Sequence, residues 1–195
     1  KTVSATTTPR NGVIEVGSEP RVIRVHVAGI DSGRSIAVGL PGGVNYLFDA
    51  EKLMIRTGWT GAFINVTRDR RGRGGGLCAI LGDKFEAGAK ESPLRLGSPN
   101  KAPETKFLGY SRIGNPTFIY EVDGVRIEQT ATGHPAKKGL TYGFRVEKPA
   151  SDVFYLVDPK DLLVSSTAGK WHPDKGYVQV PAKEASEFFI SIERK

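Results

Sequence analysis

The stretch from Arg68 to Gly76 reads RDRRGRGGG, so Arg68, Arg70, Arg71 and Arg73 stand beside a run of glycines. Such a stretch could hold an anionic group. A phosphate-binding P-loop needs G-x-x-x-x-G-K-[ST] before a helix, and a dinucleotide site needs G-x-G-x-x-G between a strand and a helix. Neither pattern is present, and no aromatic residues interleave the arginines as in nucleic-acid readers. We expect no nucleic-acid partner, which leaves a solvated loop or a docking contact to an acidic protein surface.

The residues that bind metals or act as nucleophiles are scattered. His26, His134 and His172 stand at no ligand-like spacing, and the single cysteine, Cys78, excludes an internal disulfide and a thiolate cluster. No G-x-S-x-G elbow or other motif pairs a nucleophile with a base. We predict no metal site, no cofactor and no catalytic residue, and therefore a protein that is not an enzyme.

Aromatic residues offer a different chemistry, because exposed rings stack on sugars. In a sandwich, large aromatic side chains mostly fill the core or its rim, so packing is the favoured interpretation for Trp59 and Trp171. Trp59 lies between glycines in TGWTG, which makes it the better candidate for an exposed aromatic residue. A glycan is therefore the alternative ligand.

The elements that must position these residues are strands. Segments such as RVIRVHV, SIAVGL, TFIYEV and VRIEQTAT alternate or run apolar with β-branched and aromatic residues. Asp123-Gly124, between two of them, is the clearest hairpin signal. Only Pro181 to Glu187 suits a helical turn. The sequence therefore predicts an all-β, mainly antiparallel protein.

An internal repeat extends this prediction. Residues 36–55 read IAVGLPGGVNYLFDAEKLMI and residues 144–164 read FRVEKPASDVFYLVDPKDLLV, with the spacing YLxDxxxL in both. Chance matching of common strand residues is the alternative. If the repeat is real, each copy is a three-stranded meander. Asp49 and Asp158 then hold equivalent places at the start of a reversal, where an Asp side chain closes a turn on its own backbone.

Two related, tandem antiparallel β-sandwiches that pack together follow from the repeat. The predicted boundaries are 11–87 for the first sandwich, 88–104 for a connector rich in Pro, Gly and Ser, and 105–195 for the second. Sandwiches of this size are marginal alone, which is why we expect close packing. One larger continuous β-sandwich is the alternative architecture.

The net charge of +7 is uneven. Residues 1–75 hold 11 basic and 6 acidic side chains, a surplus of five, against 17 and 15 in residues 76–195, a surplus of two. This distribution favours an acidic partner or an anionic surface. No apolar run is long enough to cross a membrane, and KTVSATTTPR lacks the apolar core of an uncleaved secretion signal, although a signal could have been removed before Lys1.

The segments PRVIRVHVAGIDSGRSIAVGLPGGVNYLFDAEKLMIRTGWTGAF, GRGGG, PLRLGS, FLGYSRIGNPTFIYEVDGV and STAGKW resemble the β-rich region found beside c-type cytochrome domains in large exported proteins of planctomycete-like bacteria. The resemblance covers most of residues 20–175 and carries no assigned activity. No CxxCH motif occurs, so the chain itself attaches no c-type haem. The resemblance implies a periplasmic or extracellular location and proximity to electron-transfer machinery.

Together these observations predict a non-catalytic accessory or docking subunit, peripheral to a membrane. Its expected partners are protein subunits of a membrane electron-transfer complex, with a c-type cytochrome among the candidates. Arg68, Arg70, Arg71 and Arg73 are the expected docking residues. A carbohydrate-binding β-sandwich module, or the remnant of a sugar-active enzyme, is the alternative function.

Overall fold

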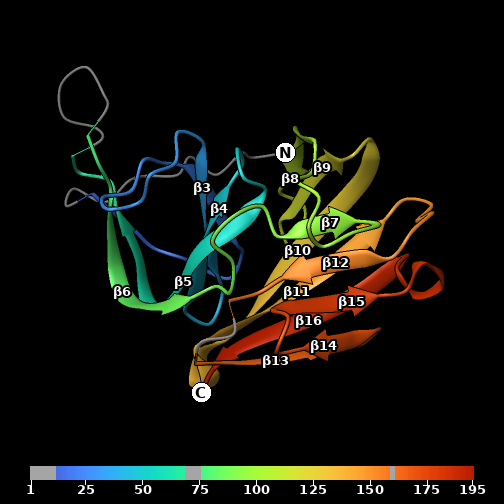
Figure 1. The fold of residues 1–195 in the computed structure, drawn as a ribbon. Coiled ribbons are helices and arrows are strands. Elements are labelled where there is room, and N and C mark those ends of the chain that lie inside the picture. Colours follow the sequence, from blue (N-terminus) through green and yellow to red (C-terminus); the bar gives the residue numbers. More distant parts are fainter. Residues whose placement is uncertain (1–11, 69–75, 159–160) are drawn as a thin grey trace.

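The computed structural model describes residues 12–68, 76–158 and 161–195 (Figure 1). Within these ranges the regular elements are β-strands and two short 3-10 segments, η1 (Pro135–Lys137) and η2 (Ala182–Glu184). Almost all strand pairs are antiparallel, with an isolated parallel bridge between Val27 and Cys78. The predicted all-β class is confirmed, and η2 is the helical turn expected near Pro181.

The first half of the chain forms one sheet, called here the N-terminal sheet. Its strands are β1 (Val13–Ile14), β2 (Arg21–Arg24), β3 (Ser35–Leu40), β4 (Val44–Asp49), β5 (Met54–Asn65) and β6 (Ala79–Glu86). The strand order is β1-β5-β4-β3-β2, and β6 also pairs with β5. The edge strand β2 therefore lies beside β3, a strand whose residues are all buried.

The second half forms two sheets. The large C-terminal sheet has the order β13-β16-β11-β10-β9-β8, and the small C-terminal sheet has the order β14-β15-β12-β7. Their strands are β7 (Leu94–Leu96), β8 (Thr105–Ser111), β9 (Thr117–Val122), β10 (Val125–His134), β11 (Gly139–Val146), β12 (Val153–Leu156), β13 (Leu162–Ser166), β14 (Lys170–His172), β15 (Tyr177–Val180) and β16 (Glu187–Arg194). Figure 1 shows the small sheet lying over the large one, and Phe144 of β11 and Tyr155 of β12 meet between them at a ring distance of 5.3 Å.

One main core joins the two halves. Phe48 of β4 stacks on Phe118 of β9 with 3.8 Å between ring centroids, and Tyr46 meets the same ring edge-on at 6.4 Å. The N-terminal sheet, the large sheet and the small sheet all contribute to this cluster. A smaller cluster lies on the other face of the N-terminal sheet. Two sandwiches that each bury their own core are therefore not confirmed, and the shared core is closer to the continuous alternative.

The close contact between the halves depends on a glycine. A Cβ atom added at Gly133 of β10 would lie 2.3 Å from the Cβ of Val44 in β4. No side chain fits at such a distance without moving one strand. Gly133 therefore lets the large C-terminal sheet approach the N-terminal sheet.

The three-stranded meander predicted for each copy of the repeat is found in the first copy only. In residues 36–55, β3, β4 and β5 are consecutive neighbours in one sheet, which is the predicted meander. In residues 144–164, β12 leaves the sheet of β11 and β13 and pairs with β15 and β7. The second copy is therefore not a meander. Segments with similar sequence patterns therefore lie in different sheets, because the pairing depends on strands that are distant in the sequence.

Two of the predicted turns, at Asp123-Gly124 and at Asp49, are found where the sequence places them, whereas the residues that follow Asp158 lie outside the described ranges. Asp123 and Gly124 form the two-residue turn between β9 and β10, with φ values of 48° and 78°, which is typical of a type I′ hairpin. Asp49 Oδ1 accepts the N–H groups of Glu51 at 2.9 Å and Lys52 at 3.1 Å. The structural role predicted for Asp49 is therefore confirmed.

The expected connector, 88–104, is more than a linker. It contains β7, whose Leu94 and Arg95 are buried and which pairs with β12 across the register Arg95–Phe154. The segment is thus part of the small C-terminal sheet.

Candidate functional site

The predicted docking loop lies mostly outside the described residues. Arg68 is exposed just after β5, whereas Arg70, Arg71 and Arg73 are not among the residues that the structure describes. The role of this loop stays a prediction.

Trp59 is not an exposed aromatic residue, and that prediction is wrong. The side chain has no exposed surface, its Nε1–H donates to the carbonyl oxygen of Phe63 at 2.8 Å, and its ring stacks on Phe63 at 5.9 Å. The neighbouring Gly58 makes room for the ring of Phe85, because a Cβ atom at Gly58 would lie 2.2 Å from Cζ of Phe85. Trp59 therefore belongs to the smaller core, as the packing interpretation expected.

The histidines and the cysteine lie apart. His134 Nε2 is 2.8 Å from Oγ1 of Thr141, the ring of His172 lies 5.3 Å from that of Tyr177, and Cys78 is buried. Among the described residues, no group of three or more His, Cys, Asp or Glu side chains could hold a metal ion.

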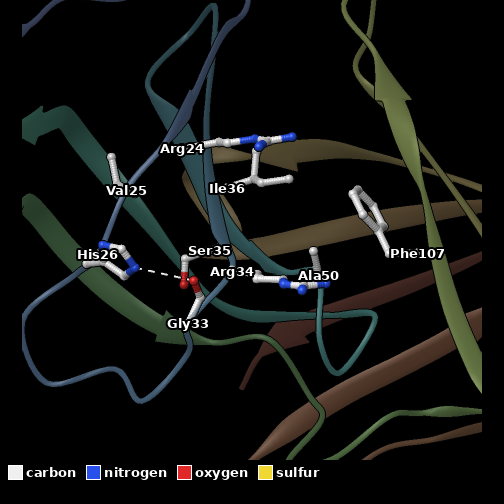
Figure 2. Close-up of a pocket in the computed structure, with 9 residues that line it drawn as sticks. All are labelled: Arg24, Val25, His26, Gly33, Arg34, Ser35, Ile36, Ala50 and Phe107. Carbon is white, nitrogen blue, oxygen red and sulfur yellow. Dashed lines mark hydrogen bonds between the residues drawn. The ribbon is translucent and has the colours of Figure 1, made fainter.

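A pocket of about 530 Å³ lies where the N-terminal sheet meets β8 of the other half (Figure 2). The residues that line it are Arg24, Val25, His26, Gly33, Arg34, Ser35, Ile36, Ala50 and Phe107. Local structure explains how they meet. Arg24 is the last residue of β2, Ser35 opens β3, and Ala50 directly follows β4. Phe107 comes from β8 and packs against Phe48 with 6.1 Å between ring centroids.

Positive charge dominates one side of this pocket. Figure 2 shows Arg24 and Arg34 extending toward Phe107, with Ile36 between them in this view. Both arginines are exposed, and neither is within ion-pair distance of an acidic side chain in the described part of the chain. The carboxylate of Glu51 lies beside Gly33 at the pocket margin. Two guanidinium groups therefore remain available to an anion.

The far end of the pocket carries further polar groups. His26 Nε2 is 3.3 Å from the carbonyl oxygen of Gly33. The hydroxyl of Ser35 is buried and has no hydrogen-bond partner among the described residues. Buried hydroxyls normally have a partner, and this one, in the pocket lining, keeps its hydrogen-bonding capacity unused.

A second hollow, of about 540 Å³, continues past Arg24. Its lining includes Arg24, Val25, Tyr110 and Arg112, so the two hollows share residues. No described residue that lines either of them is acidic. We call the combined feature the arginine groove and define it by Arg24, Arg34, Phe107, Tyr110 and Arg112.

Tyr110 reports the electrostatics of the groove. Arg112 donates to its hydroxyl at 3.0 Å and lies over its ring, with Cζ 5.4 Å from the centroid. Burial raises the pKa of Tyr110, but hydrogen bonds from Arg112 and Arg24 and their positive charge lower the pKa by more, so that it lies below the ordinary value. The groove therefore favours negative charge on an oxygen atom.

Sequence reasoning missed the groove. The available signal was an arginine inside an apolar strand segment, RVIRVHV, where Arg24 interrupts the pattern. That signal does not reveal Arg34, Tyr110 or Arg112 as neighbours, because Arg34 lies in the turn before β3 and the other two come from the second half of the chain. The groove brings together groups that bind anions, and its residues form no pair of nucleophile and base.

No helix in the described residues is long and apolar enough to cross a membrane. Comparison with known proteins places the chain in no group, since no protein-family model, no curated protein and no solved structure matches it.

Proposed function

We propose that the chain is a non-catalytic docking protein that binds an acidic partner protein through the arginine groove. The observation that carries the proposal is the pair Arg24 and Arg34, two exposed guanidinium groups that no described carboxylate neutralises. Arginine presents a planar set of donors that matches a carboxylate, so arginines without a carboxylate partner in a concave site favour acidic ligands. The net charge of +7 adds long-range attraction for such a partner.

The proposed partners are subunits of a membrane electron-transfer complex in the periplasm or outside the cell. This part of the proposal rests on the resemblance to the cytochrome-linked module. In that setting, Arg68, Arg70, Arg71 and Arg73 would guide the approach of the partner, and the groove would form the contact. Steering charges act mainly on the association rate and lose their effect in high salt.

The test is retention of a partner from detergent-solubilised host membranes by the tagged protein. We expect a complex with haem or pigment absorbance to be retained in low salt, and the double variant Arg24→Gln/Arg34→Gln to retain at least tenfold less. The matched control is Lys170→Gln/Lys183→Gln, which removes the same charge from exposed positions on β14 and η2. β14 contacts β13, at the opposite edge of the large sheet from β8.

Two results would contradict the proposal. One is a colourless monomer with no retained protein, and the other is equal retention by the groove variant and the wild type. A quadruple variant, in which Ser replaces Arg68, Arg70, Arg71 and Arg73, tests the loop separately. It should weaken retention in low salt and leave folding intact, whereas unchanged retention would remove the loop from the docking surface.

Carbohydrate binding is the second candidate, favoured by a shallow hollow on the outer face of the large C-terminal sheet. Phe189 of β16 is 43% exposed and covers Gly143, beside Thr130, Glu128 and Arg145. An exposed ring next to hydrogen-bonding groups suits a sugar. Since neither Trp59 nor Trp171 lines this hollow, tryptophan fluorescence is a poor readout. A glycan array with wild type and Phe189→Ala tests this candidate, and an array without bound glycans counts against it.

A further inference from the structure

The pocket of Figure 2 is amphipathic, and this property narrows the class of ligand. Arg24 and Arg34 supply the charge, whereas Ile36, Ala50 and Phe107 supply apolar surface between and opposite them. Its volume of about 530 Å³ lies within the range of roughly 300–1,000 Å³ that is common for ligand pockets. A carboxylate alone would leave the apolar surface in contact with water.

Because one pocket presents both kinds of surface, a ligand that matches it carries a carboxylate and an apolar group close together. A C-terminal amino acid has this arrangement, because one Cα bears both the free carboxylate and the side chain. The carboxylate of an Asp or Glu side chain is attached only to one or two methylene groups, which offer much less apolar surface than a large apolar side chain. Each guanidinium can donate two parallel hydrogen bonds to a carboxylate, which fixes its position.

We infer that the pocket binds the C-terminal residue of the partner protein, with its carboxylate between Arg24 and Arg34 and an apolar side chain against Ile36, Ala50 and Phe107. The inference rests on the proposed docking function and specifies its contact. The adjoining hollow, with Tyr110 and Arg112, lies where preceding residues of the partner would continue.

The experiment measures binding of short acetylated peptides to the full chain by backbone amide resonances. The probe is acetyl-Gly-Gly-Phe with a free carboxylate. The comparison peptides are the same peptide as an amide, acetyl-Gly-Gly-Gly with a free carboxylate, and acetyl-Gly-Gly-Asp-amide, whose only carboxylate is on a side chain. We expect the probe to bind at least tenfold more tightly than each of the three.

The shifted resonances should include those of Arg24, Arg34, Ser35, Ala50 and Phe107. Arg24→Gln/Arg34→Gln should abolish binding, while the Lys170→Gln/Lys183→Gln control should bind as the wild type does. Arg34→Lys keeps the charge but not the paired donors, and we expect intermediate affinity. The unliganded spectra show whether each variant is folded, so lost binding is not confused with unfolding.

Equal affinity for the free acid and the amide would overturn the inference. Shifts confined to other residues, or no binding at millimolar peptide, would do the same. If a partner is retained through Arg24 and Arg34 but the peptides do not distinguish acid from amide, the C-terminal contact is wrong and docking stands. If the free acid binds selectively but no membrane protein is retained, the docking proposal is wrong and the chemistry of the pocket stands.

Discussion

At the scale of residues, the balance between burial and charge sets the behaviour of individual phenols. Tyr110 lies in the arginine groove and has a lowered pKa, whereas Tyr46, Tyr120, Tyr142 and Tyr155 are buried and have raised pKa values. Phenolate formation is favoured where guanidinium groups are near and opposed where water is excluded. As the pH rises, Tyr110 should therefore ionise before these four.

Replacing Arg112 with Gln should raise the pKa of Tyr110, because the side chain loses a charged hydrogen-bond donor at 3.0 Å. The measurement is an alkaline titration followed by phenolate absorbance in wild type, Arg112→Gln and Tyr110→Phe. The contribution of Tyr110 to the titration should move to higher pH in the arginine variant and be missing in the phenylalanine variant. Superimposable titrations of wild type and Arg112→Gln would show that the guanidinium does not act on this phenol.

At the scale of elements, the contact between β10 and β4 decides how the halves join. Gly133→Ala would put a Cβ atom 2.3 Å from that of Val44, so one strand must shift. We expect a loss of about 1–3 kcal/mol in the free energy of unfolding, the usual cost of overpacking. Urea denaturation measures it. Gly17→Ala is the control, because a Cβ there would have no atom within 4 Å; equal stability of the two variants would refute the tight contact.

The elements themselves were predictable from the sequence where local chemistry decides them. Asp123-Gly124 predicts a hairpin because both positions need positive φ, and Asp49 predicts a turn because its side chain reaches the following N–H groups. The partner of β12 was not predictable. Its segment, VFYL, is apolar throughout and suits several sheets, and the choice depends on β7 and β15, which are distant in sequence.

The site was less predictable than the fold for the same reason. Trp59 between glycines suggested exposure, yet the glycine before it makes room for Phe85. Arg24 and Arg34 look like ordinary surface charges in the sequence. They are recognised as part of a site only in the structure, where Phe107 of β8 lines the same pocket. The sequence shows the type of each side chain, but only the three-dimensional structure shows that residues from the two halves line one groove.

At the scale of the whole molecule, the shared core makes stability depend on pH in the alkaline range. Burial raises the pKa of Tyr46, Tyr120, Tyr142 and Tyr155 in the folded state. An unfolded chain ionises its tyrosines near pH 10. Above that pH the unfolded state releases protons that the folded state retains, so stability falls as the pH rises.

We expect each of these four tyrosines to cost about 1.4 kcal/mol at roughly one pH unit above 10. Urea denaturation at neutral and alkaline pH measures the loss, and a single transition is expected because the core spans both halves. The hydroxyl of Tyr46 has no hydrogen-bond partner among the described residues. Tyr46→Phe should therefore keep the neutral stability and lose less at alkaline pH, whereas a stability that is flat with pH would contradict the buried phenols.

The shared core also has a consequence during synthesis of the chain. The face of the N-terminal sheet that carries Ile36, Val38 and Phe48 is covered by Phe118, Tyr120 and other residues from the second half. While the ribosome is still making β9 and β10, that apolar face has no cover, although the sheet itself can already pair. Nascent chains at this stage would expose an apolar surface. Such a surface is recognised by chaperones, and without them the chains tend to aggregate. The first half can therefore complete its core only after the strands of the second half have been synthesised.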